Sequence, residues 1–293
     1  MDYYNKIKEA LIKNEVNKKV KTYSINQSDL NTYYNVGKLL SEAGKHYGEG
    51  IIKEYSKRLT LELNKKYSMR YLFDIRKLYF FSKVHPLDAQ LSISHYRLLF
   101  PLTDNNEIDY YIDQVKKRNL SKRQLEETIK NKEYERLPEE TRVKLINDNN
   151  ELNITDLVKD PIIIKNNNYE EITEYALQKS ILEDIPAFLD ELGEGFTFIK
   201  NEYPIRVGNN YNYIDILLFN IKFNCYVVVE LKVTKLRKEH IGQIIIYMNY
   251  IDRNLKTIKQ DKTIGLIVCK ENNKFIIDYS TDKRIIAREY ELV

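Results

Sequence analysis

Residues 213–233, YIDILLFNIKFNCYVVVELKV, place three charged side chains inside a run of strand-forming residues. The run predicts two antiparallel strands joined by a turn around residues 220–223. In that register Asp215 lies opposite Glu230 or a diagonal neighbour of it, within about 5–8 Å. Because side chains alternate across a strand, Glu230 and Lys232 are expected on one face. Any fold of this chain must therefore accommodate two neighbouring carboxylates inside a sheet.

Two ionised carboxylates this close repel each other and lose hydration, so one must be protonated or a cation must lie between them. Mg²⁺ is usually held by one or two protein carboxylates beside phosphate oxygens. The sequence therefore predicts Mg²⁺ or Mn²⁺ bound by Asp215, Glu230 and the backbone carbonyl of Leu231. Lys232 would orient a water, help to deprotonate it, or neutralise charge in the transition state. The alternative is an ordinary carboxylate–lysine salt bridge on an exposed sheet face, because an ExK pattern by itself is common.

The rest of the sequence predicts two domains. Residues 1–150 carry apolar residues at helical spacing and are expected to form an all-helical domain. Residues 136–168 are polar and rich in Asn and Asp, so we interpret them as a linker with the boundary near residue 155. Residues 155–293 form the expected second domain.

The second domain alternates in the order α-β-β-β-α-β-β, which predicts a mixed sheet flanked by helices. The expected fold class is therefore α + α/β. Helices are expected over 169–193 and 238–255. Strands are expected over 196–208, 211–219, 225–233, 263–270, 274–280 and 284–292.

Charge and hydropathy narrow the classes of function. Residues 1–150 carry 28 Lys and Arg against 21 Asp and Glu, a net charge of +7, whereas residues 151–293 carry 19 against 22, a net charge of −3. A basic half suits contact with a polyanion, although a solvated Lys-rich surface is an equal alternative. No apolar run approaches the roughly 20 residues of a membrane span, and no signal-peptide pattern opens the chain. We expect a soluble cytoplasmic protein without membrane contact.

The pattern YID followed by ELK resembles the signature of the PD-(D/E)xK nuclease superfamily, with Ile214 where the nominal proline stands. Residues 188–255 are similar to the YhcG-like family of bacterial proteins, which have a helical N-terminal domain and a C-terminal nuclease domain. The first half resembles the same family through four segments in the expected order: YYNVGKLL, YSMRYLFDIRKLYFF, LSISHYRLL and LSKRQLEETI.

This resemblance implies a restriction-endonuclease-like second domain that acts as a Mg²⁺-dependent endonuclease on DNA. It makes Asp215 and Glu230 the metal ligands, Lys232 the catalytic lysine, and Gln243 a residue of the next helix that faces the site. The superfamily often adds an acid from the first helix, and here Glu174 is the candidate. Gln178, one helical turn later, occupies the position where that acid is expected.

The resemblance also implies two kinds of partner. Many such nucleases dimerise, so a homodimer is expected, and the helical half is expected to bind DNA or dock a protein partner. Helix starts rich in Lys and Arg contact phosphates without reading sequence. The candidate DNA-binding residues are Lys65, Lys66, Arg70, Arg76, Lys77, Lys122 and Arg123. The rival interpretation is a nuclease fold whose catalysis was lost through Gln178 and which binds DNA or scaffolds a complex, for example in a defence or restriction system.

Overall fold

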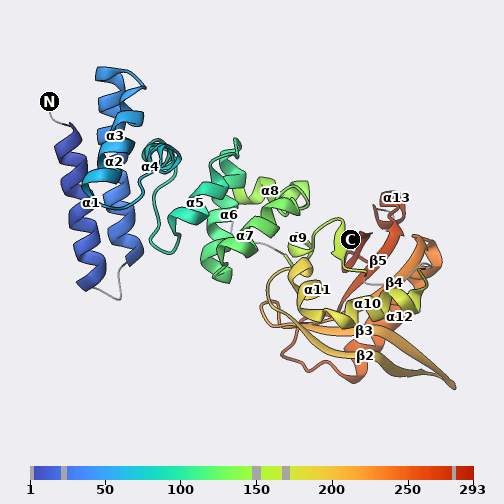
Figure 1. Cartoon of the computed structure of the whole chain (residues 1–293). Helices are drawn as coiled ribbons and strands as arrows, with labels where there is room; N and C mark the ends of the chain where they lie inside the picture. Colours follow the sequence, from blue (N-terminus) through green and yellow to red (C-terminus); the bar gives the residue numbers. More distant parts are fainter. Residues whose placement is uncertain (1–2, 21–24, 147–152, 167–171, 279–281) are drawn as a thin grey trace. The chain divides into compact units, whose positions relative to one another are not determined.

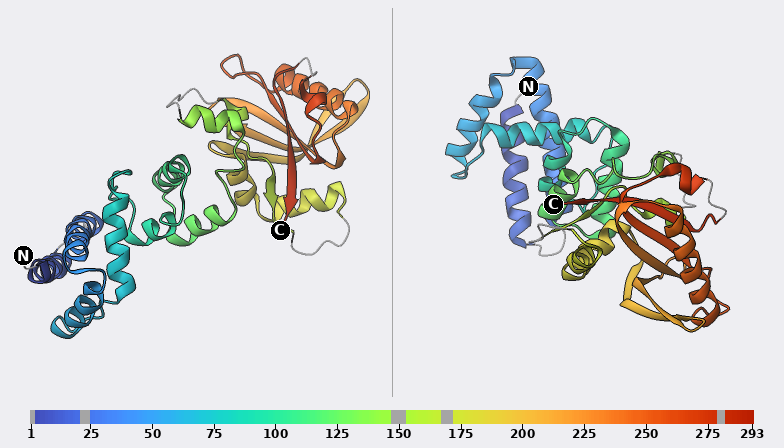
Figure 2. Two further views of the ribbon diagram at one scale, coloured as in Figure 1. Left: turned by 90° about the horizontal axis from the view of Figure 1, so that it is seen from above. Right: turned by 90° about the vertical axis from the view of Figure 1, so that its right-hand side faces the viewer.

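The computed structural model describes residues 3–20, 25–146, 153–166, 172–278 and 282–293 (Figures 1 and 2). Its contacts divide the chain into two compact units, Met1–Tyr134 and Glu135–Val293. No helix among the described residues is long and apolar enough to cross a membrane.

The first unit is helical, as the apolar spacing predicts. Among the described residues its helices are α1 (Tyr3–Val20), α2 (Ile25–Tyr47), α3 (Ile51–Glu62), α4 (Met69–Phe81), α5 (Ile93–Leu99), α6 (Asn105–Arg118) and α7 (Lys122–Lys130). Ser68 is the N-cap of α4, and its hydroxyl accepts a hydrogen bond from the Tyr71 backbone N–H at 3.2 Å. Ser121 caps α7 in the same way, with Gln124 bonding back to the Ser121 N–H.

The second unit is a six-stranded mixed sheet with helices on both faces, which confirms the expected fold class. The strand order is β1-β6-β5-β4-β3-β2; the β2–β3 and β3–β4 pairs are antiparallel and the remaining pairs parallel. The strands are β1 (Ile162–Ile164), β2 (Phe196–Val207), β3 (Asn210–Asn220), β4 (Cys225–Lys235), β5 (Ile264–Glu271) and β6 (Ile285–Leu292).

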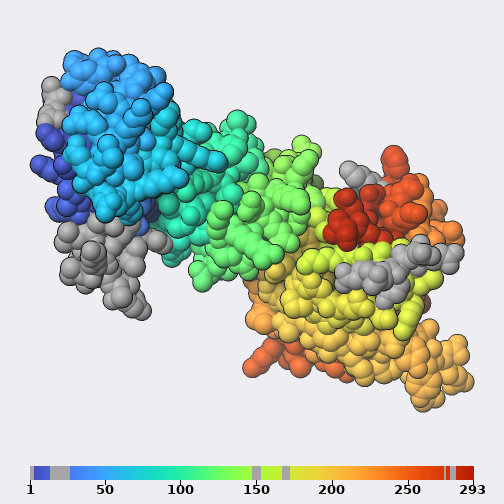
Figure 3. Space-filling model, in the orientation of Figure 1, coloured from blue at the N-terminus to red at the C-terminus, as the bar shows by residue number. Residues whose placement is uncertain are grey.

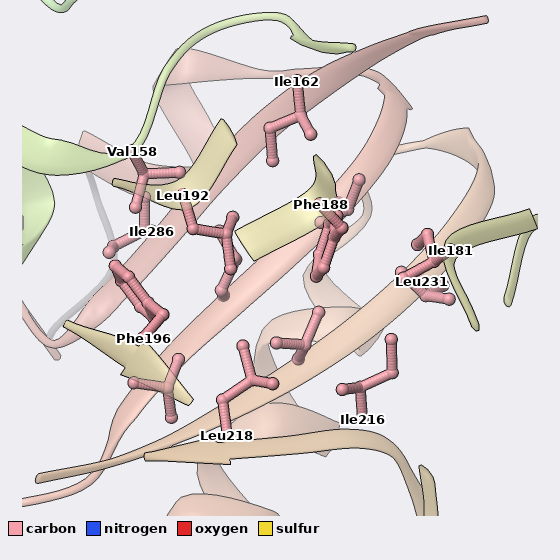
Figure 4. Close-up of a cluster of buried hydrophobic side chains, with 14 of the residues drawn as sticks. Val158, Ile162, Ile181, Phe188, Leu192, Phe196, Ile216, Leu218, Leu231 and Ile286 are labelled. Atoms are coloured by element: carbon pink, nitrogen blue, oxygen red, sulfur yellow. The ribbon is translucent and has the colours of Figure 1, made fainter. Parts of the chain in front are cut away.

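Two hydrophobic clusters cover the two faces of this sheet. On one face, α10 (Glu174–Glu183) and α11 (Ile185–Leu192) pack on alternate residues of β3 and β4 (Figure 4). On the other face, α12 (Lys238–Asn254) packs on the intervening residues, including Leu217 and Val228. The central strands are therefore buried on both faces, as their continuous apolar runs predict. The tip of the β2–β3 hairpin projects from this body (Figures 1 and 3).

Three expectations about elements are wrong. The helix expected over 169–193 is two helices in its described part, because Asp184 ends α10 and caps α11, and Pro186 occupies the first turn of α11. The strand expected over 274–280 is a short helix, α13 (Lys274–Asp278), in its described part. The linker expected over 136–168 contains α8 (Glu139–Ile146), α9 (Ile154–Leu157) and the edge strand β1.

Helix α2 approaches α4 closely at Gly37. A Cβ atom added there would lie 2.5 Å from the backbone oxygen of Ile75 and 2.9 Å from the Cβ of Tyr79. Neither atom can rotate away, so only glycine permits this helix contact. Gly44, later in α2, would place its Cβ 3.3 Å or more from side-chain atoms of Glu49 and Arg76, which are flexible.

We therefore predict that Gly37→Ala lowers the free energy of unfolding by about 1–3 kcal/mol, because the helices must separate to admit the methyl group. Gly44→Ala is the matched control and should be neutral or should stabilise by up to about 1 kcal/mol through helix propensity. Urea unfolding of the full chain, followed by far-ultraviolet circular dichroism, measures both. Equal stability of the two variants would contradict the close contact.

Candidate active site

The β3–β4 turn sets the register that brings the two predicted acids together. The side-chain oxygen of Asn220 accepts hydrogen bonds from the backbone N–H groups of Lys222 and Phe223 at 3.0 and 3.1 Å. The strands then pair from Asn220 opposite Cys225 to Ile216 opposite Val229. One position further along each strand come Asp215 and Glu230.

Asp215 leaves the regular ladder and bonds to β4 through its side chain. Its Oδ2 accepts a hydrogen bond from the backbone N–H of Leu231 at 2.8 Å. Its backbone carbonyl accepts a hydrogen bond from the side-chain amide of Gln178 in α10 at 2.9 Å. Burial raises the pKa of Asp215, while the Leu231 N–H and the charge of Lys232 oppose that rise. Helix α10 and strand β4 together fix where this carboxylate lies.

Glu230 is the least solvated acid of the group, with 1% of its surface exposed. Burial, and next the charge of Asp215, raise its pKa to about 8. One carboxylate oxygen, Oε2, lies 3.3 Å from the Nζ of Lys232. The other, Oε1, is buried and has no hydrogen-bond partner among the described residues. A buried acceptor without a partner is costly, so this atom is suited to receive a cation.

In the described part of the chain, Lys232 is the one ammonium that contacts this group of three acids. Its Nζ lies 3.3 Å from Glu230 and 3.4 Å from the Oε2 of Glu174. Burial lowers its pKa, but the charges of Glu230, Glu174 and Asp215 outweigh burial and leave the pKa raised. Lys232 is therefore cationic at neutral pH. Glu174 stands in the first turn of α10, which Thr173 caps, and its side chain is 46% exposed.

Helix α12 contributes His240, Gln243 and Tyr247. They are three and four residues apart, so they share one face of the helix. Gln243 donates a hydrogen bond to the hydroxyl of Tyr247 at 3.0 Å. Burial raises the pKa of Tyr247, and the charges of Glu230 and Asp215 raise it further. Burial lowers the pKa of His240, and Lys232 lowers it further. Tyr247 belongs to the buried cluster that contains Val228 of β4, two residues before Glu230, so this face of α12 borders the site.

Sequence reasoning named Gln243 as a site residue but missed Tyr247. The signal was available, because a tyrosine four residues after a candidate site residue lies on the same helical face. The sequence also indicates Gln178 only as the residue that replaces an expected acidic ligand. In the structure Gln178 is buried and donates to the Asp215 carbonyl, which an ionised carboxylate cannot do.

The donor set fits a hard divalent cation. Among the described residues, no group of three or more His, Cys, Asp or Glu side chains is arranged to hold a metal ion. Mg²⁺ does not need such a cage, since it keeps several waters and is commonly held by one or two carboxylates. Asp215 and Glu230 supply two carboxylates, and the unpartnered Oε1 of Glu230 supplies a free oxygen.

The candidate DNA-binding side chains of the first unit differ in their surroundings. Arg76 is engaged by both carboxylate oxygens of Glu49, which favours the structural alternative for this residue. Lys65 lies 5.9 Å from the ring centroid of Tyr67. The remaining candidates are exposed: Lys66, Arg70, Lys77, Lys122 and Arg123.

Comparison with known proteins matches both units to described families. Residues 155–293 match the family model of the YhcG PDDEXK nuclease domain, and residues 7–136 match that of the DUF1016 N-terminal domain. The "Putative nuclease YhcG" of Escherichia coli (strain K12) is 23% identical over 92% of this chain and 84% of that protein.

Two solved structures also resemble part of the chain. A repair endonuclease from Pyrococcus abyssi is 22% identical, with a TM-score of 0.30, over 43% of this chain and 49% of its own. EndoMS in a complex with double-stranded DNA is 18% identical, with a TM-score of 0.29, over 43% of this chain and 48% of its own. The likeness thus spans about half of each of these proteins.

The mixed sheet, with its acid pair and lysine on two adjacent strands, is a restriction-endonuclease-like nuclease domain of the PD-(D/E)xK class. Nucleases of this class generally use divalent metal ions. Residues 155–293 belong to the YhcG PDDEXK nuclease domain family of that class, and residues 7–136 to the DUF1016 N-terminal domain family.

The raised pKa of Glu230 predicts how stability depends on pH without metal. A carboxyl group whose pKa is higher in the folded than in the unfolded chain adds to the free energy of unfolding while it is protonated. This contribution is complete below the unfolded-state pKa, about 4.3, and is lost as the pH rises through the folded-state pKa of about 8. Glu230→Gln removes the charge and keeps the shape. In EDTA its melting temperature should exceed that of the wild type at pH 9 and match it at pH 5.

Differential scanning fluorimetry at the two pH values measures this effect as a difference between variant and wild type. Glu271→Gln is the control, because Glu271 is an exposed acid paired with Lys235, and its difference should be small at both pH values. A Glu230→Gln difference that does not change with pH would show that Glu230 is not protonated by its surroundings.

Proposed function

We propose that this chain hydrolyses phosphodiester bonds of DNA in a reaction that depends on Mg²⁺ or Mn²⁺. Asp215, Glu230 and the backbone carbonyl of Leu231 would hold the ion. The observation that carries this proposal is the buried Oε1 of Glu230, which has no partner in the described part of the chain although a second acid lies beside it. A cation at that atom would remove both the repulsion and the unpaired acceptor.

The bound ion would supply Lewis-acid stabilisation of phosphate charge and a more acidic water. The protein's own groups then divide the remaining tasks. The Leu231 N–H and the Gln178 amide hold Asp215 in place, so its carboxylate does not have to reorganise when the ion binds. Glu230 would release, as the ion binds, the proton that its raised pKa leaves on it, so that Asp215 and Glu230 both face the ion as carboxylates.

Without a bound ion, the charges of Glu230, Glu174 and Asp215 raise the pKa of Lys232, so its ammonium keeps its proton. In that form Lys232 would orient the attacking water and neutralise charge that develops on the phosphate. Glu174 shares the ammonium with Glu230 and so limits how far Lys232 turns away. Gln243 and Tyr247, hydrogen-bonded to each other, would border the substrate on the α12 side.

The helical unit would add affinity for DNA without reading sequence. Lys122 and Arg123 follow the cap Ser121, so their side chains and the α7 N-terminus present positive charge together. Lys66 and Arg70 are exposed at the start of α4, and Lys77 is exposed two turns later in the same helix. The expected homodimer and protein partner remain predictions, which light scattering and pull-down with the full chain test.

A non-catalytic DNA-binding module is the second candidate function. Gln178 favours it only if an acid at that position is required to hold the ion. The hydrogen bond from Gln178 to the Asp215 carbonyl weakens the argument that Gln178 abolishes catalysis, because the amide holds the backbone of Asp215 in the same site.

The cleavage assay separates the two functions. The full chain should nick or cut plasmid or oligonucleotide DNA in Mg²⁺ or Mn²⁺ and not in EDTA. Asp215→Ala and Lys232→Ala should each reduce the rate at least about a hundredfold, which is the cost of removing one electrostatic stabiliser. Lys235→Ala, on the same strand but exposed and paired with Glu271, should keep the wild-type rate. DNA binding without cleavage in any metal would establish the non-catalytic module.

Contact by the helical unit predicts a specific salt dependence. Each neutralised phosphate contributes about 0.9 to the slope of log affinity against log salt. Replacing Lys122 and Arg123 by Gln should therefore flatten the slope for duplex DNA by up to about 1.8, whereas Lys8→Gln, which breaks an ion pair with Glu62, should leave it unchanged. Filter binding at several salt concentrations measures the slopes. An unchanged slope in the double variant would remove these residues from the interface.

A further inference from the structure

The β2–β3 hairpin continues well past the sheet that holds the site. Pairing between β3 and β4 covers Ile216–Asn220 only, whereas β2 and β3 remain paired as far as Val207 opposite Asn210. Gly208, with φ of 63°, makes the tight turn at the end. Residues 203–214 therefore form a two-stranded ribbon, whose tip projects from the unit in Figures 1 and 3.

The two faces of this ribbon differ sharply. On one face, Ile205 and Ile214 are 1% and 0% exposed and belong to the core that packs against α12. On the other face, Tyr211 and Tyr213 are 65% and 57% exposed. Tyrosine is favoured in strands in general, but that propensity does not explain two rings that are left in solvent.

A positive charge accompanies these rings. Arg206 lies directly opposite Tyr211, so their side chains share a face, and its guanidinium lies 5.8 Å from the ring centroid. Its Nε donates to the carbonyl of Gly208 at 3.2 Å, which holds the arginine along the ribbon. The exposed face of the ribbon is thus aromatic and cationic, and we refer to Arg206, Tyr211 and Tyr213 as the ribbon face.

The ribbon face lies on β3, the strand that carries Asp215. Tyr213 and Tyr211 precede Asp215 by two and four residues on the same strand. At a rise of about 3.3 Å per residue, their Cα atoms lie about 7 and 13 Å from that of Asp215. Nucleotides adjoining a scissile phosphate held at Asp215 would lie within reach of these rings.

We propose that the ribbon face binds unpaired bases of the nucleic-acid substrate by stacking, so that the domain prefers substrates with a single-stranded segment beside the scissile bond. The proposal rests on the proposed nuclease function and names its substrate class. Exposed aromatic rings stack on any base regardless of sequence, and cations alongside them follow the backbone. In a fully paired duplex the bases stack on each other and present no free face to these rings.

Binding in EDTA tests the proposal separately from catalysis. Fluorescence anisotropy of the full chain would compare a short oligothymidylate, an abasic oligonucleotide of equal length and a blunt duplex. Tyr211→Ala and Tyr213→Ala should each weaken binding of the oligothymidylate about tenfold. The Phe variants should bind as the wild type does, because the ring is kept. The abasic strand should bind wild type and Ala variants alike, and affinity for the duplex should not change.

Phe275→Ala is the matched control. Phe275 is a 74% exposed aromatic residue of the same unit, on α13. Its replacement should leave all three affinities unchanged. Circular dichroism checks that each variant keeps its fold, as replacement of exposed rings should allow.

Several outcomes would overturn the proposal. These are unchanged affinity of the Ala variants for the oligothymidylate, equal wild-type affinity for the abasic strand, equal losses on the duplex, or no binding of single strands at all. A lower molar mass of a Tyr211→Ala/Tyr213→Ala double variant than of the wild type, by light scattering, would assign the ribbon face to a second copy instead. Metal-dependent cleavage of duplex DNA alongside any of these results would leave the proposed nuclease function intact.

Discussion

The burial of two carboxylates on adjacent strands, with one ammonium beside them, is the interaction on which this unit depends. Asp215 and Glu230 are held close by the β3–β4 register, and Glu174 brings a third acid within reach of Lys232. Burial raises the pKa of Glu230, and the charge of Asp215 raises it further, while the charge of Lys232 only partly opposes both effects. A site that is electrostatically unfavourable when empty is well suited to take up a divalent cation.

The fold supplies this arrangement from both faces of the sheet. The turn at Asn220 sets the register, and α10 on one face positions the Asp215 backbone through Gln178. Helix α12 closes the other face with Gln243 and Tyr247. Packing serves the site indirectly: the apolar clusters on each face hold these helices, and the sheet keeps the two acids from moving apart. The hydrophobic core thus determines where the charged side chains of the site lie.

The sequence predicted the two-part fold, the strand pair and the meeting of Asp215 with Glu230, because period-two patterning and a short turn leave little freedom in register. It failed where local patterns are ambiguous. The apolar run at 274–280 suits a strand or a helix equally, and only the structure distinguishes them. The sequence predicts a linker where β1 lies, because its strand partner β6 is more than a hundred residues later in the chain. The sequence also could not predict the hydrogen bond of Gln178, since residue type does not show which backbone carbonyl a side-chain amide contacts.

The most direct test of the central claim is a crystal structure of the wild-type chain soaked in Mn²⁺, with an anomalous difference map. The account predicts one strong peak within coordination distance of both Asp215 and the free Oε1 of Glu230, with Lys232 beside it. A well-ordered site with no peak, with the two acids each bonded to a separate cationic side chain, would contradict it.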